Sequence, residues 1–126
     1  MNNKLVIGTA QFGINYGIAN SLGQVRSEEA KKILDYSLSK DINYIDTATS
    51  YGESEKVLGG LDVNRFKIIT KIPKIPYDQI NPYDWLESSV LDSLNRLNVK
   101  SIHALLLHSP EDLLGVHGLT LYKGLR

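Results

Sequence analysis

The chain has 126 residues, 42% apolar and 22% charged, a balance typical of one soluble globular domain. Fourteen basic residues balance fourteen acidic ones, so charge gives no reason to expect nucleic acid or an anionic membrane as a partner. The absence of cysteine excludes disulfides and thiolate metal sites, and no metal site is predicted. No apolar run reaches the roughly 18 residues of a membrane helix, and the run before Gly8 is too short for a signal peptide, so we expect a cytoplasmic protein.

The first half of the chain alternates predicted strands with predicted helices. The apolar run within residues 4–8 predicts a short parallel strand buried on both faces, and a long glycine-dotted loop follows it. Ser27 is expected to cap a helix whose apolar residues recur at helical spacing. Residues 43–46 predict a second strand. Ser50 and the glutamate three residues later fit a capping box, so the next helix is expected to start there and to end at the glycines 59–60.

The second half continues the alternation. Residues 66–71 predict a third strand, Pro82 suits the first position of a third helix, residues 102–107 predict a fourth strand, and a last helix is expected near Thr120. Strands that alternate with helices imply a parallel sheet with right-handed crossovers. This rhythm fits an eight-stranded barrel and a doubly wound sheet equally well. Without a linker, residues 1–126 are expected to form one domain.

Chemically versatile side chains follow three successive predicted strands: Asp46, Tyr51, Lys71 and His108. Each has an ordinary structural interpretation, as a turn aspartate, a half-buried aromatic, a surface lysine and a core histidine. In a parallel α/β barrel, however, the carboxyl ends of all strands share one face, which carries the catalytic groups. The four residues taken together therefore indicate a site at that face.

Five motifs occur in a fixed order along the chain: Gly8-Thr9-Ala10-Gln11-Phe12-Gly13, Asp46-Thr47-Ala48, Tyr51-Gly52-Glu53-Ser54-Glu55, Thr70-Lys71 and Leu107-His108-Ser109-Pro110. With them the chain resembles the aldo/keto reductase family from about Lys4 to Pro110. The Tyr-Gly-Glu-Ser-Glu segment, with Asp-Thr-Ala upstream, is highly specific for that family. The opening also resembles a bacterial branch that begins directly at the first strand.

The resemblance implies a TIM-type (β/α)8 barrel that reduces an aldehyde or ketone with NADPH, of which this chain holds the first four β/α units, a half barrel. Thr9, Gln11 and Asp46 would lie near the nicotinamide ribose. A small carbonyl compound is the implied substrate, and neither nucleic acid nor a membrane is an implied partner.

Carried over to matching positions, the resemblance makes Tyr51 the general acid, Lys71 and Asp46 its electrostatic partners, and His108 the group that orients the substrate. The chemistry is consistent, because hydride transfer builds negative charge on the carbonyl oxygen and a proton donor must meet it. An ammonium beside a tyrosine stabilises its phenolate, and a carboxylate balances that ammonium. With Ser50 as helix cap, Tyr51 would also feel the helix dipole in the first turn.

Length is the main departure from the family, because a complete barrel takes about 250 residues. We therefore expect a truncated form that lacks the loops for the cofactor phosphates, is inactive alone and self-associates through its open strand edges. Two alternatives remain: a regulatory or binding subunit of the same fold, and an unrelated doubly wound ligand-binding protein. The lysine–aspartate pair disfavours the first, and the lack of a Gly-x-Gly-x-x-Gly turn after the first strand disfavours the second.

Overall fold

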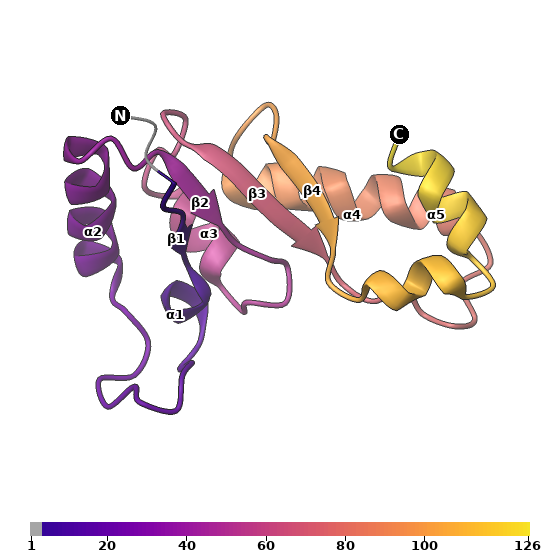
Figure 1. Ribbon diagram of the computed structural model, residues 1–126, viewed down its shortest axis with the longest axis horizontal. Helices are drawn as coiled ribbons and strands as arrows, with labels where there is room; N and C mark the ends of the chain where they lie inside the picture. The colour runs from indigo at the N-terminus through magenta and orange to yellow at the C-terminus, as the bar shows by residue number, and fades with distance from the viewer. Residues whose placement is uncertain (1–3) are drawn as a thin grey trace.

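The computed structural model describes residues 4–126 and contains one sheet of four parallel strands in the order β1-β2-β3-β4 (Figure 1). The strands are β1 (Ile7–Gly8), β2 (Tyr44–Asp46), β3 (Lys67–Ile72) and β4 (Ala104–Leu107). The helices are α1 (Ala10–Gly13), α2 (Ser27–Ser39), α3 (Ser54–Gly59), α4 (Pro82–Leu97), the 3-10 helix η1 (Pro110–Leu114) and α5 (Gly118–Gly124). A doubly wound sheet would place β1 inside the sheet. The sequential order confirms the barrel-type half expected from the motifs.

Two expectations about the start of the chain are wrong. Strand β1 has only two residues, and Leu5 and Val6 before it are 60% and 46% exposed, so the first strand is not buried on both faces. Within residues 4–126 it is the edge strand of the sheet and is paired with a strand on one side only. Ser27 is the first residue of α2 rather than its cap, which is Arg26.

Two short elements were missed in segments expected to be loops. Helix α1 has four residues and η1 has five. A single turn contains too few apolar residues to display the 3.6-residue period by which helices are recognised in a sequence. Among residues 4–126, no helix is long and apolar enough to cross a membrane.

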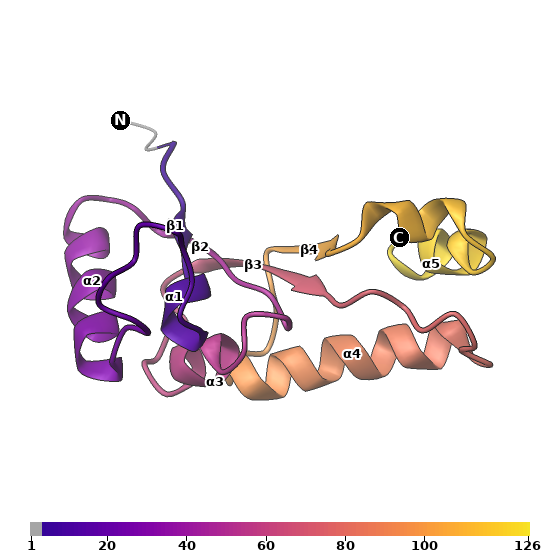
Figure 2. The same cartoon turned by 90° about the horizontal axis from the view of Figure 1, so that it is seen from below.

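The sheet has one face covered by helices and one open face. Figure 2 shows α3 and α4 on the same side of the strands. The side chains of β3 alternate in burial between the two faces. Ile68, Thr70 and Ile72 are buried, and the residues between them are more exposed. The main apolar core lies on the covered side and contains Phe12, Ala30, Leu34, Ile45, Leu58, Val63, Ile68 and Leu97.

The register places Asp46 and Lys71 on the open face at the carboxyl end of the sheet. Asp46 is paired with Ile69, and Lys71 lies two residues farther along the same face of β3. Such diagonal neighbours are within reach of long side chains. On the next strand Leu106 is paired with Lys71, so His108 follows just beyond the end of β4. The sheet itself thus delivers three of the four predicted residues to one place.

Candidate functional site

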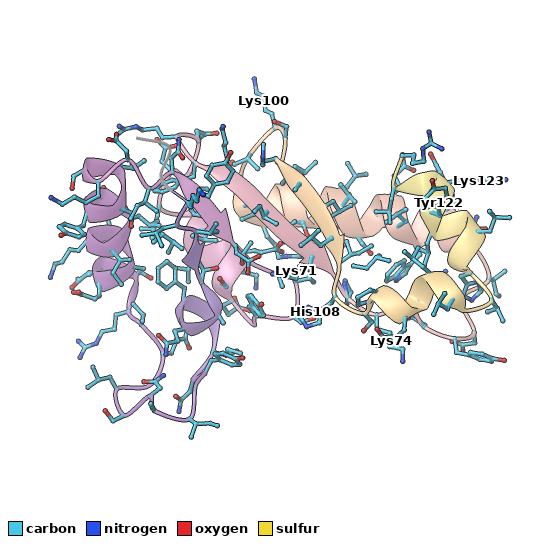
Figure 3. All side chains as sticks on the ribbon, viewed as in Figure 1. Lys71, Lys74, Lys100, His108, Tyr122 and Lys123 are labelled. Atoms are coloured by element: carbon cyan, nitrogen blue, oxygen red, sulfur yellow. The ribbon has the colours of Figure 1, made fainter. Side chains whose placement is uncertain are left out.

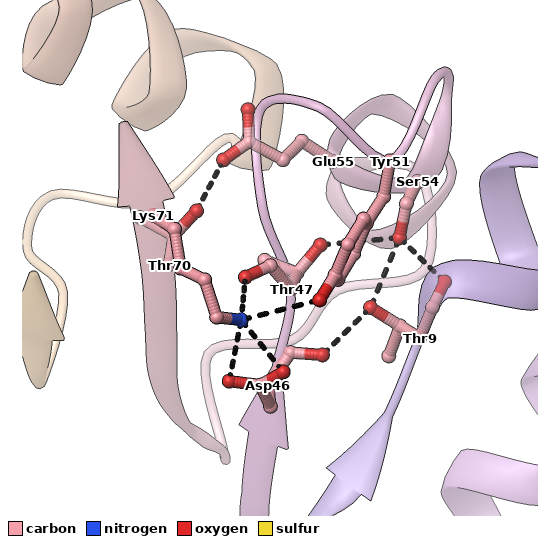
Figure 4. A network of polar contacts seen from close by, with 8 residues as sticks. All are labelled: Thr9, Asp46, Thr47, Tyr51, Ser54, Glu55, Thr70 and Lys71. Atoms are coloured by element: carbon pink, nitrogen blue, oxygen red, sulfur yellow. Dashed lines mark hydrogen bonds and ion pairs between the residues drawn. The ribbon is translucent and has the colours of Figure 1, made fainter. Parts of the chain in front are cut away.

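Lys71 and Asp46 form the centre of the site. The Nζ atom of Lys71 donates to both carboxylate oxygens of Asp46, at 2.8 and 2.7 Å, and to the carbonyl oxygen of Thr47 at 3.0 Å (Figure 4). The Lys71 side chain is 17% exposed and that of Asp46 is 32% exposed. The ammonium is therefore held in a fixed position on the open face, while part of the carboxylate remains accessible.

Tyr51 and His108 complete the group. The Tyr51 hydroxyl lies 3.5 Å from the Lys71 Nζ atom, and that nitrogen is 5.1 Å from the centre of the Tyr51 ring. The His108 ring meets the Tyr51 ring edge-on, with centroids 6.1 Å apart. Lys71 and His108 lie at the same end of β3 and β4 (Figure 3). The structure thus brings together all four residues that the sequence had placed at the carboxyl ends of the strands.

Tyr51 lies in a turn, not in the first turn of a helix. Helix α3 begins at Ser54 with Glu53 at the cap position, and no side chain forms a capping hydrogen bond. The predicted capping box at Ser50 is therefore wrong, and so is the argument that the helix dipole acts on Tyr51. The physical reason is Gly52, whose φ of +56° is left-handed and interrupts the helical conformation between Tyr51 and Ser54.

The turn is held against α1 by a close approach of backbones. A Cβ atom added to Gly13 would overlap the Tyr51 carbonyl oxygen and the Ser54 amide nitrogen. A Cβ atom on Gly52 would lie 2.6 Å from the Gly13 carbonyl oxygen. Glycine at both positions lets the backbone of α1 pack directly against the segment that carries Tyr51, and this contact fixes the backbone of that segment.

Thr9 and Gln11, the other predicted cofactor residues, differ in their surroundings. Thr9 is fully buried; its hydroxyl donates to the Asp46 carbonyl oxygen at 3.0 Å and accepts from the Ser54 hydroxyl at 3.0 Å. Thr9 thereby joins the ends of β1 and β2 to the start of α3. Gln11 is exposed, and its amide donates to the Tyr16 carbonyl oxygen at 2.9 Å.

A buried ion pair behind the site was not predicted. The Glu55 side chain is 1% exposed, and its Oε2 atom accepts from the Arg96 Nε atom at 2.8 Å. Its Oε1 atom accepts from the Thr70 hydroxyl at 2.6 Å. One signal in the sequence pointed to Glu55, namely its position inside the specific Tyr-Gly-Glu-Ser-Glu segment. An acid near a helix start is commonly exposed, however, and its partner lies 41 residues away along the chain.

The arrangement has the components of an acid catalyst for a developing oxyanion. A phenol and an imidazole lie beside each other at the open end of the sheet, and an ammonium touches the phenol. The carboxylate of Asp46 compensates the charge of the ammonium at hydrogen-bond distance. Groups fixed in advance around one point stabilise charge that appears there without having to reorganise.

Known proteins share both the sequence and the fold of this chain. The model of the aldo/keto reductase family matches residues 4–115. Oxidoreductase sirO of Leptosphaeria maculans is 35% identical over 111 residues, which cover 85% of this chain and 33% of that protein. A 6-dehydroglucose reductase of Novosphingobium aromaticivorans is 32% identical over 100 residues, which cover 66% of this chain and 32% of that protein.

A solved structure agrees with these relatives. The crystal structure of a Pseudomonas aeruginosa protein assigned to the aldo-keto reductases matches with a TM-score of 0.73 and 27% identity, covering 95% of this chain and 51% of that one. This chain therefore spans about a third of the length of the two sequence relatives and about half of the structural one. These relatives come from a fungus and from bacteria, so the assignment to a bacterial branch of the family stays a prediction. Because the family model covers most of the sequence and the same half-barrel fold recurs in a relative, the chain belongs to the aldo/keto reductase family.

Proposed function

We propose that this chain supplies the acid-catalytic half of an NADPH-dependent reductase that converts an aldehyde or ketone to an alcohol. The observation that carries the proposal is the contact of one ammonium, that of Lys71, with both the Asp46 carboxylate and the Tyr51 hydroxyl. A lysine that only stabilised the fold would need its carboxylate partner but no phenol at the open end of the sheet. The second half of the barrel would complete the enclosure of the site.

Tyr51 donates its proton to the carbonyl oxygen as that oxygen becomes negative. The Lys71 ammonium, 3.5 Å from the Tyr51 hydroxyl, stabilises the phenolate that remains. Asp46 keeps the ammonium in place, because an unpaired ammonium would turn toward solvent. His108, beside the Tyr51 ring, donates a hydrogen bond to the same carbonyl oxygen and fixes its direction of approach.

NADPH, when bound, supplies the hydride. The accessible part of the Asp46 carboxylate suits a ribose hydroxyl, because each oxygen keeps a free lone pair after accepting from Lys71. The exposed Gln11 side chain lies on α1, just after β1, and would be a second contact to the ribose. Thr9 would support the ribose contact indirectly, since its buried hydroxyl donates to the carbonyl oxygen of Asp46 and holds that residue in place.

The test uses a completed barrel, in which residues 1–126 are followed by the carboxyl half of the Pseudomonas aeruginosa relative. A panel of aromatic aldehydes and of sugar-derived ketones is assayed, the latter because one relative is named for reducing 6-dehydroglucose. Tyr51→Phe should lower kcat by roughly 100- to 10,000-fold, the usual contribution of a general acid. The dissociation constant for NADPH should stay within about twofold, since the phenol contributes to the chemical step rather than to cofactor affinity.

Tyr36→Phe is the matched control, because Tyr36 lies on α2 and is 65% exposed. Full turnover by Tyr51→Phe would contradict the proposal, as would an equal loss of NADPH binding. A barrel that binds NADPH and reduces no member of the panel would instead favour a non-catalytic binding subunit.

A further inference from the structure

Glu55 is a buried charge that the proposed mechanism does not use. Its side chain is 1% exposed, and both of its oxygens are occupied by partners from other elements. One partner is the Thr70 hydroxyl on β3 and the other is the Arg96 guanidinium on α4. A single carboxylate at the start of α3 thus joins three elements behind the sheet.

Glu55 and Thr70, which are joined by a hydrogen bond, each lie close in sequence to a residue of the proposed mechanism. Glu55 follows Tyr51 by four residues in the same short segment, and Thr70 directly precedes Lys71 on β3. Side chains alternate between the two faces of a strand, so Thr70 points to the helices while Lys71 points to the open face. Figure 4 shows the Glu55–Thr70 contact and the Lys71 contacts, which start from neighbouring residues of β3.

Arg96 contacts the segment around Tyr51 at both of its ends, Thr49 and Glu55. Its Nη2 atom donates to the Thr49 hydroxyl at 3.4 Å and to the Ser93 hydroxyl at 3.2 Å. The backbone amide of Thr49 donates to the Lys71 carbonyl oxygen at 3.0 Å. Residues 49–55 are therefore anchored to β3 and α4 on both sides of Tyr51.

Two further features make this anchoring matter for the site. The segment around Tyr51 consists of turns rather than a regular helix or strand. The contact between the Tyr51 hydroxyl and Lys71 is 3.5 Å, the longest of the four that the Nζ atom makes. A small displacement of the segment would break that contact first, and misplacement of a catalytic group by about 1 Å can cost about 100-fold in rate.

We propose that Glu55 is a positioning residue, which sets the distance between Tyr51 and Lys71 through its contacts with Thr70 and Arg96. The proposal rests on the proposed function of Tyr51 and Lys71. The assigned effect of Glu55 on turnover is indirect, because its carboxylate is 1% exposed on the helix side of the sheet and bound to Thr70 and Arg96.

The kinetic test compares variants of the completed barrel. Thr70→Val removes only the hydroxyl that contacts Glu55, Thr70→Ser restores it, and Glu55→Gln removes the charge that pairs with Arg96. We expect Thr70→Val and Glu55→Gln to lower kcat by roughly 10- to 100-fold. KM for the carbonyl and the dissociation constant for NADPH should change by less than about threefold, and Thr70→Ser should recover most of kcat. Lys56→Gln is the matched control, since Lys56 lies on the same helix and its ion pair with Glu53 is exposed.

A second measurement works on the 126-residue chain and does not depend on activity. Hydrogen exchange at the amides of Thr49 and Tyr51, which donate to Lys71 and Ala48, should accelerate in Thr70→Val and Glu55→Gln and stay unchanged in α2. Unchanged exchange together with kcat within about twofold of the parent would overturn the positioning role. If Tyr51→Phe keeps full turnover, the proposed function fails, while the exchange data still decide whether Glu55 holds the segment.

Discussion

Lys71 binds Asp46 through both carboxylate oxygens, at 2.8 and 2.7 Å, across two neighbouring strands. The pair follows from the register, because the side chains are diagonal neighbours on the open face of the sheet. Its geometry directs the ammonium toward Tyr51 rather than toward solvent. Lys71 is thereby available for charge stabilisation at a fixed point.

Replacing Lys71 should lower turnover strongly with little loss of fold stability. Lys71→Met keeps the length of the side chain and removes the charge, so we expect kcat of the completed barrel to fall by roughly 100- to 1,000-fold. Asp46, about a third exposed, can then be solvated by water, so the free energy of unfolding should change by only about 1 kcal/mol. Steady-state kinetics and urea denaturation measure the two effects. A kcat above about a tenth of the parent value would contradict a role for this ammonium in the reaction.

His108 should affect substrate use, whereas His103 should not. His108 is exposed beside Tyr51 at the carboxyl end of β4, and the ring of His103 meets that of Tyr44 edge-on just before the amino end of that strand. We expect His108→Ala to lower kcat/KM by roughly 10- to 100-fold, because a donor to the carbonyl oxygen is lost. His103→Ala serves as the matched control and should stay within about twofold. Equal effects of the two substitutions would show that His108 acts through stability alone.

Gly13 should be sensitive to the smallest enlargement. In Gly13→Ala the new methyl group would overlap the backbone of Tyr51 and Ser54, so the chain should lose about 1–3 kcal/mol of unfolding free energy. Gly60→Ala is the control, because its φ is −78° and its added Cβ would meet only ordinary contacts. Urea denaturation of both variants gives the comparison. A Gly13→Ala variant as stable as the parent would mean that α1 and the Tyr51 turn move apart without cost.

The 126-residue chain alone should show no NADPH-dependent turnover. The chain spans about half of the structural relative, and the proposed cofactor contacts here reach only the nicotinamide end. Without a hydride donor held close to the substrate, the reaction loses a proximity advantage worth roughly 7–11 kcal/mol. NADPH fluorescence titration and an aldehyde assay test this. Micromolar binding with turnover by a monomer would refute it.

The same chain should self-associate in solution. Strands β1 and β4 are unpaired on their outer sides within residues 4–126, and Leu106 on the open face is 45% exposed. Such edges and apolar surface favour association with another copy. Sedimentation should give a mass above that of one chain that rises with concentration, and Leu106→Ser should weaken the association. A single species of monomer mass at all concentrations would argue against it.

The sequence predicted the strands and the placement of the candidate site residues better than the connections between the strands. Asp46, Lys71 and His108 could be placed together because parallel strands end on one side of a sheet, whatever the loops do. The start of α3 was misplaced because the glutamate that fits a capping box lies after Gly52, whose left-handed backbone breaks the helix. The position of Glu55 in a specific motif did not reveal its burial, because the burial depends on α4, which approaches only through the tertiary fold.

The segment from Tyr51 to Glu55 assigns a different task to almost every side chain. Tyr51 faces the open end of the sheet, Gly52 accepts a left-handed backbone, Ser54 bonds to Thr9, and Glu55 binds Thr70 and Arg96. Glu53 alone makes only an exposed ion pair with its side chain. In a saturation library of these five positions, the tolerated substitutions should therefore occur mainly at Glu53. A sequence pattern that leaves this position open should find more distant proteins that share the other four residues.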